Sequence, residues 1–263
     1  MAISYKRNDA GFFDYPMEKL HGEWFRGPLD RGPDAIAWLG AAQTFGRYVE
    51  EPFPGVVGKR LDLGTLNLGS GGKGPRYFLR HPELLEEVNR CRVAVIQVMS
   101  AKGSDNSLFQ SEKGGAKGLR TDTGTVTRAL TIHDDLIAEG RRREAKKIAG
   151  ESQRAYVEEM RRLFEAVTPP KVLLWISFRN CQRGSWTYRQ TLTSFPQLVN
   201  AKMISQIKPL ADRFVEVVSR AGIPQAIRDD AGNTARTNAY YPSPEMHRLA
   251  ADQLTPVLRQ LIG

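Results

Sequence analysis

The order of apolar and polar positions along the chain predicts strands that alternate with helices. Five short runs are rich in branched apolar residues and are bounded by Gly, Pro or polar clusters, which is typical of buried strands. They cover residues 35–39, 61–68, 93–99, 172–177 and 214–219. Over residues 141–167, apolar side chains recur at spacings of three and four, which predicts a long amphipathic helix.

This alternation predicts one α/β domain over residues 1–263. We expect a three-layer α/β/α sandwich around a five-stranded, mainly parallel sheet of flavodoxin-like type. Ligands in such folds bind beyond the carboxyl ends of the strands, which directs attention to loops 40–46, 69–75, 100–106 and 178–186. The segment 238–247, before the last helix, is a fifth candidate. Residues 101–124 are rich in glycine and predict a mobile loop or lid.

The composition bears on the cellular compartment and on the charge of the expected partners. No apolar run approaches the roughly 18 residues of a membrane span, and the first residues lack the pattern of a signal peptide, so we expect a cytoplasmic protein. Cys91 and Cys181 stand far apart and are expected to be reduced thiols. A formal charge of +9 favours anionic partners.

Two groups of residues bear on whether the chain binds a metal or a cofactor. The histidines His21, His81 and His133 do not show the spacing of metal ligands, so we expect no metal site. Gly69, Gly71 and Gly74 satisfy the dinucleotide fingerprint G-x-G-x-x-G, but they follow the second strand and lack the ribose-binding acid after the next one. The simpler alternative is a tight turn between strand and helix. The motifs therefore identify no cofactor.

Three loop motifs carry the candidate chemistry. The first strand leads into L-G-A-A-Q-T-F-G (39–46), a glycine turn that opens a helix, whose amides can hold an anion. The second leads into N-L-G-S-G-G-K-G-P (67–75), and Y-Y-P-S-P-E-M-H (240–247) precedes the last helix. Together these motifs resemble the SGNH (GDSL-type) hydrolase superfamily, in a bacterial branch that lacks the usual serine.

The resemblance implies roles for particular residues. His247 would be the general base, since an imidazole titrates near working pH. The backbone amides of Gly40 and Gly72 would hold a developing oxyanion, and Asn106 would add its side-chain amide. Glu245 would orient or polarise His247.

The sequence departs from the superfamily at two positions. Ala42 stands where the nucleophilic serine is expected, and Pro244 stands where the aspartate is expected. A methyl group cannot attack a carbonyl, so the Ser-His-Asp mechanism cannot run as in the superfamily. Ser70 or Ser100 could supply a replacement hydroxyl, and Gln43 lies in the same turn as Ala42.

Basic residues follow several of the predicted strands. Arg179 and Arg183 come directly after the fourth strand, where guanidinium groups could bind carboxylate, sulfate or phosphate, and Trp186 could stack on a sugar or base. Further basic residues on other loops could complete a cationic rim at the strand ends: Lys73, Lys102, Arg228 and Arg236. The alternative is that these are scattered, solvated charges.

Three functions follow from these features. The first is an SGNH-like enzyme for acyl or related group transfer or hydrolysis on a carbohydrate or anionic substrate, in which His247 activates an acceptor hydroxyl or water. The second is a transferase of polysaccharide biosynthesis that uses a nucleotide-type sulfo or acyl donor. The third is a non-catalytic protein that binds carbohydrate or nucleotide. Nucleic acid is a weaker alternative because no recognition motif is present.

Overall fold

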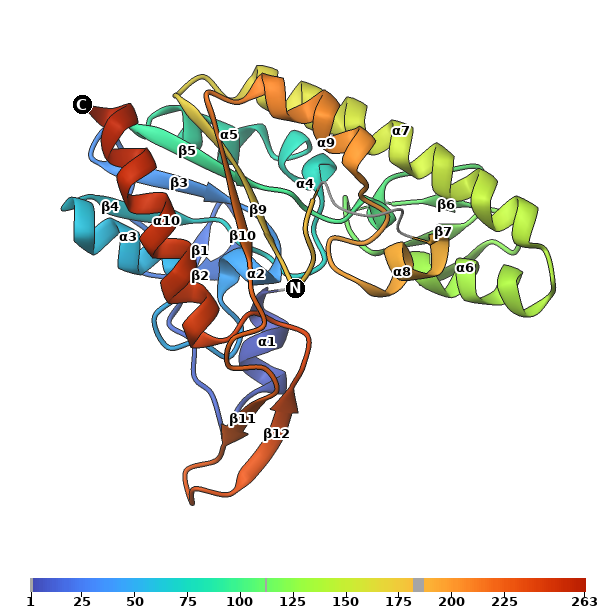
Figure 1. Ribbon diagram of the computed structural model, residues 1–263, viewed down its shortest axis with the longest axis horizontal. Helices are drawn as coiled ribbons and strands as arrows, with labels where there is room; N and C mark the ends of the chain where they lie inside the picture. Colours follow the sequence, from blue (N-terminus) through green and yellow to red (C-terminus); the bar gives the residue numbers. More distant parts are fainter. Residues whose placement is uncertain (1, 112, 182–186) are drawn as a thin grey trace.

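The centre of the molecule is a five-stranded parallel sheet in the order β10-β9-β5-β3-β4 (Figure 1). The computed structural model describes residues 2–111, 113–181 and 187–263. The strands are β3 (Ala35–Leu39), β4 (Gly64–Asn67), β5 (Val93–Gln97), β9 (Lys171–Ser177) and β10 (Arg213–Val218). The predicted five-stranded parallel sheet is therefore confirmed.

Three small antiparallel sheets surround this core. They pair β1 (Met17–Leu20) with β2 (Glu23–Arg26), β11 (Gln225–Arg228) with β12 (Thr234–Asn238), and β6 (Phe109–Gln110) with β7 (Lys117–Arg120) and β8 (Thr125–Arg128). The β11–β12 hairpin projects from the body at the bottom of Figure 1. None of these sheets was predicted, because their strands are short and most of their side chains are exposed or half-buried.

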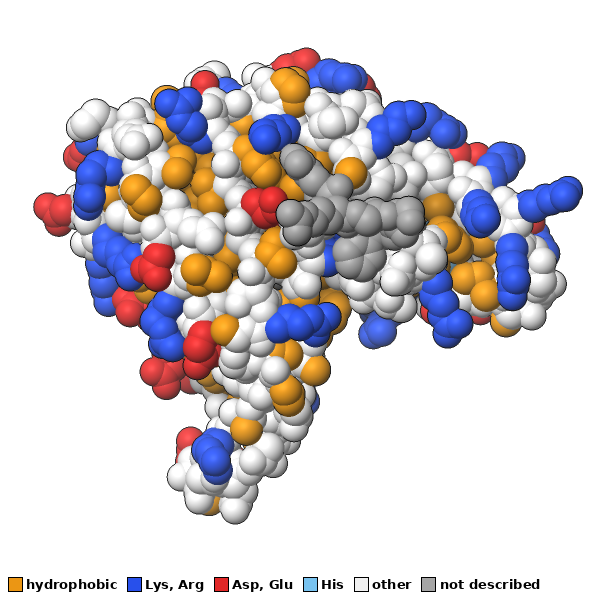
Figure 2. Space-filling view, viewed as in Figure 1, with side chains coloured by type: hydrophobic (Ala, Val, Ile, Leu, Met, Phe, Trp, Pro, Cys, Tyr) orange, Lys and Arg blue, Asp and Glu red, His pale blue; other side chains and the backbone are white. Residues whose placement is uncertain are grey.

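The β6–β7–β8 sheet falls in the segment predicted to be a loop or lid. With α6 (Ala129–Ala138), it forms a lobe that packs on the first turns of α7 (Arg142–Ala166) through Phe109, Ile132 and Ile148. Lys and Arg side chains gather on the surface of this lobe (Figure 2). That the segment moves as a lid stays a prediction.

Both faces of the central sheet are covered by helices. Side chains alternate along each strand, so that Ile96 and Leu173 enter one apolar cluster while Val95 and Leu174 enter the other. The first cluster is covered by α5 (Pro82–Asn89), α7 and α9 (Ala201–Ile207), and the second by α3 (Phe53–Leu61) and α10 (Pro244–Ile262). The three-layer α/β/α architecture is thus confirmed.

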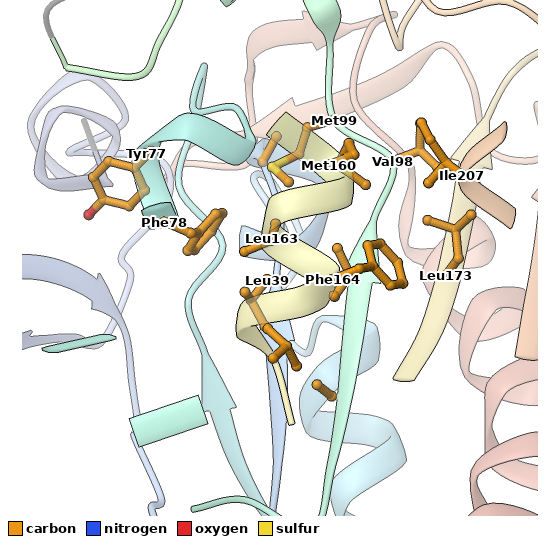
Figure 3. Packing of buried hydrophobic residues seen from close by; sticks show 14 of the residues in the cluster. Leu39, Tyr77, Phe78, Val98, Met99, Met160, Leu163, Phe164, Leu173 and Ile207 are labelled. Atoms are coloured by element: carbon orange, nitrogen blue, oxygen red, sulfur yellow. The ribbon is translucent and has the colours of Figure 1, made fainter. Parts of the chain in front are cut away.

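Helix α7 supplies much of the first cluster. Its residues Met160, Leu163 and Phe164 are buried and pack with Leu173 and Ile207 (Figure 3). The helix runs over 25 residues, close to the predicted 141–167, because its apolar positions keep the spacing of an α-helix throughout.

One predicted strand began too early. Residue Leu61 ends helix α3, and Asp62 caps it in the left-handed conformation with φ of 54°. The chain must reverse there before it becomes extended, so β4 begins only at Gly64. Apolar residues on both sides of that turn made the run look continuous.

The remaining elements are short and connect these layers. They are α1 (Ala2–Asn8), α2 (Ala42–Phe45), α4 (Pro75–Leu79), α8 (Tyr188–Thr193) and two 3-10 turns, Ala101–Gly103 and Lys208–Leu210. Across the described ranges, every helix is too short or too polar to cross a bilayer. Both cysteines, Cys91 and Cys181, are buried free thiols, as predicted.

Candidate ligand-binding site

A hollow of about 300 Å³ opens where the parallel strands end. Because β3, β4 and β5 run in the same direction, their following loops meet at one edge of the sheet. These three loops contribute Ala42 and Gln43, Gly72 and Lys73, and Ser100 and Lys102 to its lining. Other segments complete it with Tyr5, Lys117, Arg128, Gln197, Tyr240 and Tyr241.

Gln97, the last residue of β5, fixes the turn around Ala42 through hydrogen bonds. The fully buried Gln97 accepts hydrogen bonds at Oε1 from the Ala41 amide (3.0 Å) and the Thr44 hydroxyl (2.6 Å). A Cβ on Gly40 would lie 2.1 Å from Thr44 Oγ1, so only glycine fits this turn. Gln97 was not singled out in the sequence, although a polar residue at the end of a buried apolar strand was a usable signal.

The second loop is tied to the first through Asn67. Its side chain accepts a hydrogen bond from the Gly69 amide (3.0 Å) and donates one to the Thr44 carbonyl (3.1 Å). A Cβ on Gly71 would lie 1.9 Å from the hydroxyl of Tyr5, so glycine allows that ring to reach the hollow. The glycines of this loop therefore serve close packing around the hollow.

A chain of polar side chains crosses one wall. Ser100 donates to Gln197 Oε1 (2.5 Å), and Gln197 Nε2 donates to the Tyr240 hydroxyl (2.6 Å). Since Tyr240 accepts in this chain, its own proton remains available to a ligand. The wall thus presents a hydroxyl donor whose position is fixed.

The electrostatic character of the hollow is positive. Four cationic side chains line it, namely Lys73, Lys102, Lys117 and Arg128. In the described part of the chain, no Asp or Glu lines it. Burial, aided by Arg128, lowers the pKa of Lys102 to about 8, and burial also lowers the pKa of Lys73. Lys73 in addition lies over the ring of Tyr77, with Nζ 4.0 Å from its centroid.

A buried ion pair supports the far wall. Arg47 binds the carboxylate of Asp9 through Nε (2.8 Å) and Nη2 (2.6 Å), and the Asp9 side chain is fully buried. The same guanidinium donates to the Tyr241 hydroxyl (3.0 Å) and lies 4.3 Å from the ring centroid of Tyr5. Both tyrosines of this wall are therefore fixed by one arginine.

Five of the sequence-predicted residues meet in this hollow. They are Ala42, Gln43, Gly72, Lys73 and Ser100. Gly40 lies behind the lining, where its carbonyl accepts from the Ser70 amide at 3.0 Å. Ser70 itself is buried and does not line the hollow, so it is not a replacement nucleophile there.

His247 does not line the hollow, which corrects the expectation that it is the general base. Its ring is 1% exposed, stacks on Phe53, and accepts a hydrogen bond at Nδ1 from the Phe53 amide (3.0 Å). Neutral imidazole must then carry its proton on Nε2, which is buried and has no hydrogen-bond partner in the described residues. Burial, with the charge of Arg26, lowers the pKa of His247 to about 3. Neither ring nitrogen of His247 is therefore available to act as a base on a substrate in the hollow.

Two other predicted catalytic residues are also placed elsewhere. Asn106 donates to Ser152 Oγ (2.9 Å), which fixes the loop to α7, and accepts from the Leu108 amide (2.8 Å) within the loop itself. Glu245 is exposed on the first turn of α10, with Arg248 3.6 Å away. Neither lines the hollow, because each turns toward its own local partners.

The predicted arginine cluster has a structural role where it is described. Arg179 is buried and donates from Nη2 to the carbonyls of Pro196 (2.7 Å) and Val199 (2.9 Å), which fixes the loop after β9. Arg183 and Trp186 lie outside the described residues. The cationic rim is instead built by Lys73 and Lys102 with residues of the β6–β7–β8 lobe, while Arg228 and Arg236 belong to the β11–β12 hairpin and do not line the hollow.

Fold and hollow together define an α/β protein with a positively charged hollow at the carboxyl edge of a parallel sheet. The chain belongs to the family described as Domain of unknown function (DUF6473), whose model matches residues 3–113 and 135–262. None of the curated proteins matches the sequence.

Solved structures similar to the chain include enzymes described as a GDSL-like lipase and as carbohydrate esterases. A GDSL-like lipase from Bacteroides thetaiotaomicron is 13% identical, with 86% of this chain and 88% of that chain covered and a TM-score of 0.44. A variant of an acetyl-xylooligosaccharide esterase from Geobacillus is 12% identical, with 89% and 97% covered and a TM-score of 0.44. A carbohydrate esterase family 2 enzyme from Corynascus is 12% identical, with 93% and 71% covered and a TM-score of 0.45.

Proposed function

We propose that this protein binds an anionic small molecule or sugar in the hollow, through phosphate, sulfate or carboxylate groups. The observation that carries the proposal is the set of four cations around a hollow whose described lining contains no carboxylate. Desolvated cations of this kind are costly without a counter-charge, and an anionic ligand would supply it. The lowered pKa of Lys102 is a direct expression of that cost.

The rest of the lining favours a ligand that also carries hydroxyl groups. Gln43 and Gln197 offer amides, Ser100 and Tyr240 offer hydroxyls, and the ring of Tyr5 offers an apolar face. Amides and hydroxyls both donate and accept, which suits a sugar or the ribose of a nucleotide. A phosphorylated, sulfated or acidic sugar and a nucleotide are the ligands that fit both features.

An acyl-enzyme mechanism has no support from this site. Ala42 has no nucleophilic atom, and His247 has no exposed nitrogen. We therefore propose non-covalent binding as the primary function.

Calorimetric titration tests the proposal with three anionic probes and one neutral probe. We expect adenosine 3′,5′-bisphosphate, glucose 6-sulfate or galacturonate to bind, and glucose not to bind. Lys102→Met should weaken the binding about 10- to 100-fold, because a hydrogen bond to a charged group contributes about 1.5–3 kcal/mol. Lys202→Met is the control, since Lys202 is exposed on α9 and lines no part of the hollow. Failure of all three anions to bind, or full affinity in Lys102→Met, would contradict the proposal.

A second candidate function is group transfer with Lys102 as general base. A pKa of about 8 leaves part of the Lys102 amine neutral near physiological pH, as a general base requires. The amine would take the proton of an acceptor hydroxyl as its oxygen bonds to the sulfo or acyl group, and the donor's leaving group would depart with the bonding electron pair. Mass spectrometry of a sugar acceptor incubated with acetyl-coenzyme A or adenosine 3′-phosphate 5′-phosphosulfate tests this. Transfer that survives Lys102→Met would exclude Lys102 from that role.

A further inference from the structure

A second, larger hollow adjoins the first one at the β6–β7–β8 lobe. It measures about 630 Å³, against about 300 Å³ for the inner hollow. Three cations line both spaces, namely Lys73, Lys117 and Arg128. The two hollows therefore adjoin along a shared cationic wall; we call the pair the channel and the second hollow the outer groove.

The outer groove keeps the charge of the inner hollow. It adds Lys113, and in the described part of the chain its lining also lacks Asp and Glu. The channel has four lysines and one arginine, namely Lys73, Lys102, Lys113, Lys117 and Arg128. Among the described residues, none of these five cations is in a salt bridge, although 17 such bridges occur elsewhere. On a chain with 29 Asp and Glu residues, a described lining with five cations and no carboxylate is a specific arrangement. The charge of Glu23 acts on Lys73 from outside this lining.

The rest of the outer lining indicates the kind of ligand. Ser4 and Asn8 offer a hydroxyl and an amide, and Val126 offers an exposed aliphatic surface. No aromatic ring lines the outer groove in its described part, whereas proteins that bind single-stranded nucleic acids stack the bases on such rings. A lining that combines hydrogen-bonding groups with cations fits the hydroxyl and acidic groups of a polysaccharide better.

We propose that the channel binds an acidic polysaccharide chain, with one end in the inner hollow and the following charged sugars along the outer groove. This inference rests on the proposed function, because the inner hollow must accept an anionic sugar first. It goes further in assigning the outer groove a ligand and in requiring that the ligand be longer than one sugar.

Titration with a heparin-derived disaccharide and octasaccharide at several salt concentrations tests the inference. We expect the octasaccharide to bind at least about 10-fold more tightly than the disaccharide, since it alone reaches the outer groove. Lys113→Ala should weaken only the octasaccharide and lower the salt slope of its affinity by roughly one, as expected for one lost contact with a polyanion. Lys102→Met should weaken both ligands, and Lys202→Met should change neither.

The outcomes separate the two proposals. If the disaccharide binds but the octasaccharide binds no better, or if Lys113→Ala has no effect, the outer groove is not a binding surface and only the inner site stands. If neither saccharide binds while glucose 6-sulfate or adenosine 3′,5′-bisphosphate does, the polysaccharide inference fails and the proposed function stands; if none of these anions binds, both proposals fail. If an eight-residue oligothymidylate binds more tightly than the octasaccharide, the ligand is a nucleic acid and the polysaccharide assignment is overturned.

Discussion

At the scale of single residues, chemistry depends on which way a side chain turns. His247 and Tyr241 belong to the same segment before and within α10, yet the imidazole packs in the core beside Phe53 while the phenol lines the hollow. The sequence indicated a functional role for this segment, and the structure brings its Tyr241, rather than His247, to the hollow. A histidine is compatible with both places, because its neutral form tolerates burial.

The buried state of His247 predicts a pH dependence of stability. Its pKa falls from 6.5 in the unfolded chain to about 3 in the fold, so below pH 6.5 the unfolded chain binds more protons. Stability should therefore be complete above pH 6.5 and fall toward pH 3, by up to about 1.4 kcal/mol per pH unit. Urea unfolding at a series of pH values measures this slope.

The variant His247→Asn isolates that contribution. The Asn side-chain oxygen can accept from the Phe53 amide in place of Nδ1 but does not titrate, so the slope should become shallower. It should not vanish, because burial also lowers the pKa of His133, to about 4. An unchanged slope in His247→Asn would show that the imidazole is not buried in its neutral form.

At the scale of elements, the turns after the strands were the most informative part of the sequence. Glycines marked the loops after β3 and β4, and the structure brings both loops to the hollow. The contact that requires glycine differs from one position in these loops to the next. A Cβ on Gly69 would lie 2.3 Å from the backbone nitrogen of Phe45, whereas a Cβ on Gly71 would meet the side-chain hydroxyl of Tyr5.

Alanine at these two positions should therefore have different effects. Gly69→Ala must displace the backbone of α2 and should cost about 1–3 kcal/mol or more of unfolding free energy. Gly71→Ala only pushes the ring of Tyr5 aside, so it should cost less stability and weaken glucose 6-sulfate binding. Urea unfolding and calorimetric titration measure the two quantities.

Gly150→Ala provides the control for that pair. Gly150 lies within α7, and the nearest atom to an added Cβ is Arg154 Nη1 at 3.6 Å. Alanine there should stabilise the helix by about 0.5–1 kcal/mol and leave binding unchanged. Equal losses in Gly69→Ala and Gly71→Ala would contradict the difference between a backbone and a side-chain contact.

At the scale of the whole molecule, the basic residues behind the net charge of +9 lie in two different settings. On the surface of the lobe, Arg141 pairs with Glu139 and Glu144, as a solvated surface does. In the channel, Lys102 and its neighbours face one another without a carboxylate in the described lining. Only the second arrangement has an electrostatic reason to attract an anion.

The affinity for an anion should consequently depend on pH around 8. The fold lowers the pKa of Lys102 from 10.5 to about 8, so its charge is present below pH 8 and is lost above it. An anion binds the charged form better, so the affinity for glucose 6-sulfate should fall between pH 7 and pH 9, where the sulfate ester itself stays ionised. The fall should be absent in Lys102→Met, and titration calorimetry at constant salt measures both. An affinity that is flat over this range in the unaltered protein would rule out Lys102 as a ligand contact.

The sequence by itself determined the layers of this protein. Short continuous apolar runs in the strands and a spacing of three to four in α7 are local properties, and the parallel sheet with its converging loops follows from them. Tertiary structure alone decided which polar groups share the hollow. Lys117 and Arg128 reach Lys73 only because an antiparallel sheet, stabilised by its packing on α7, turns back over the glycine loop. Such contacts depend on packing between residues far apart in the chain, and no local pattern records them.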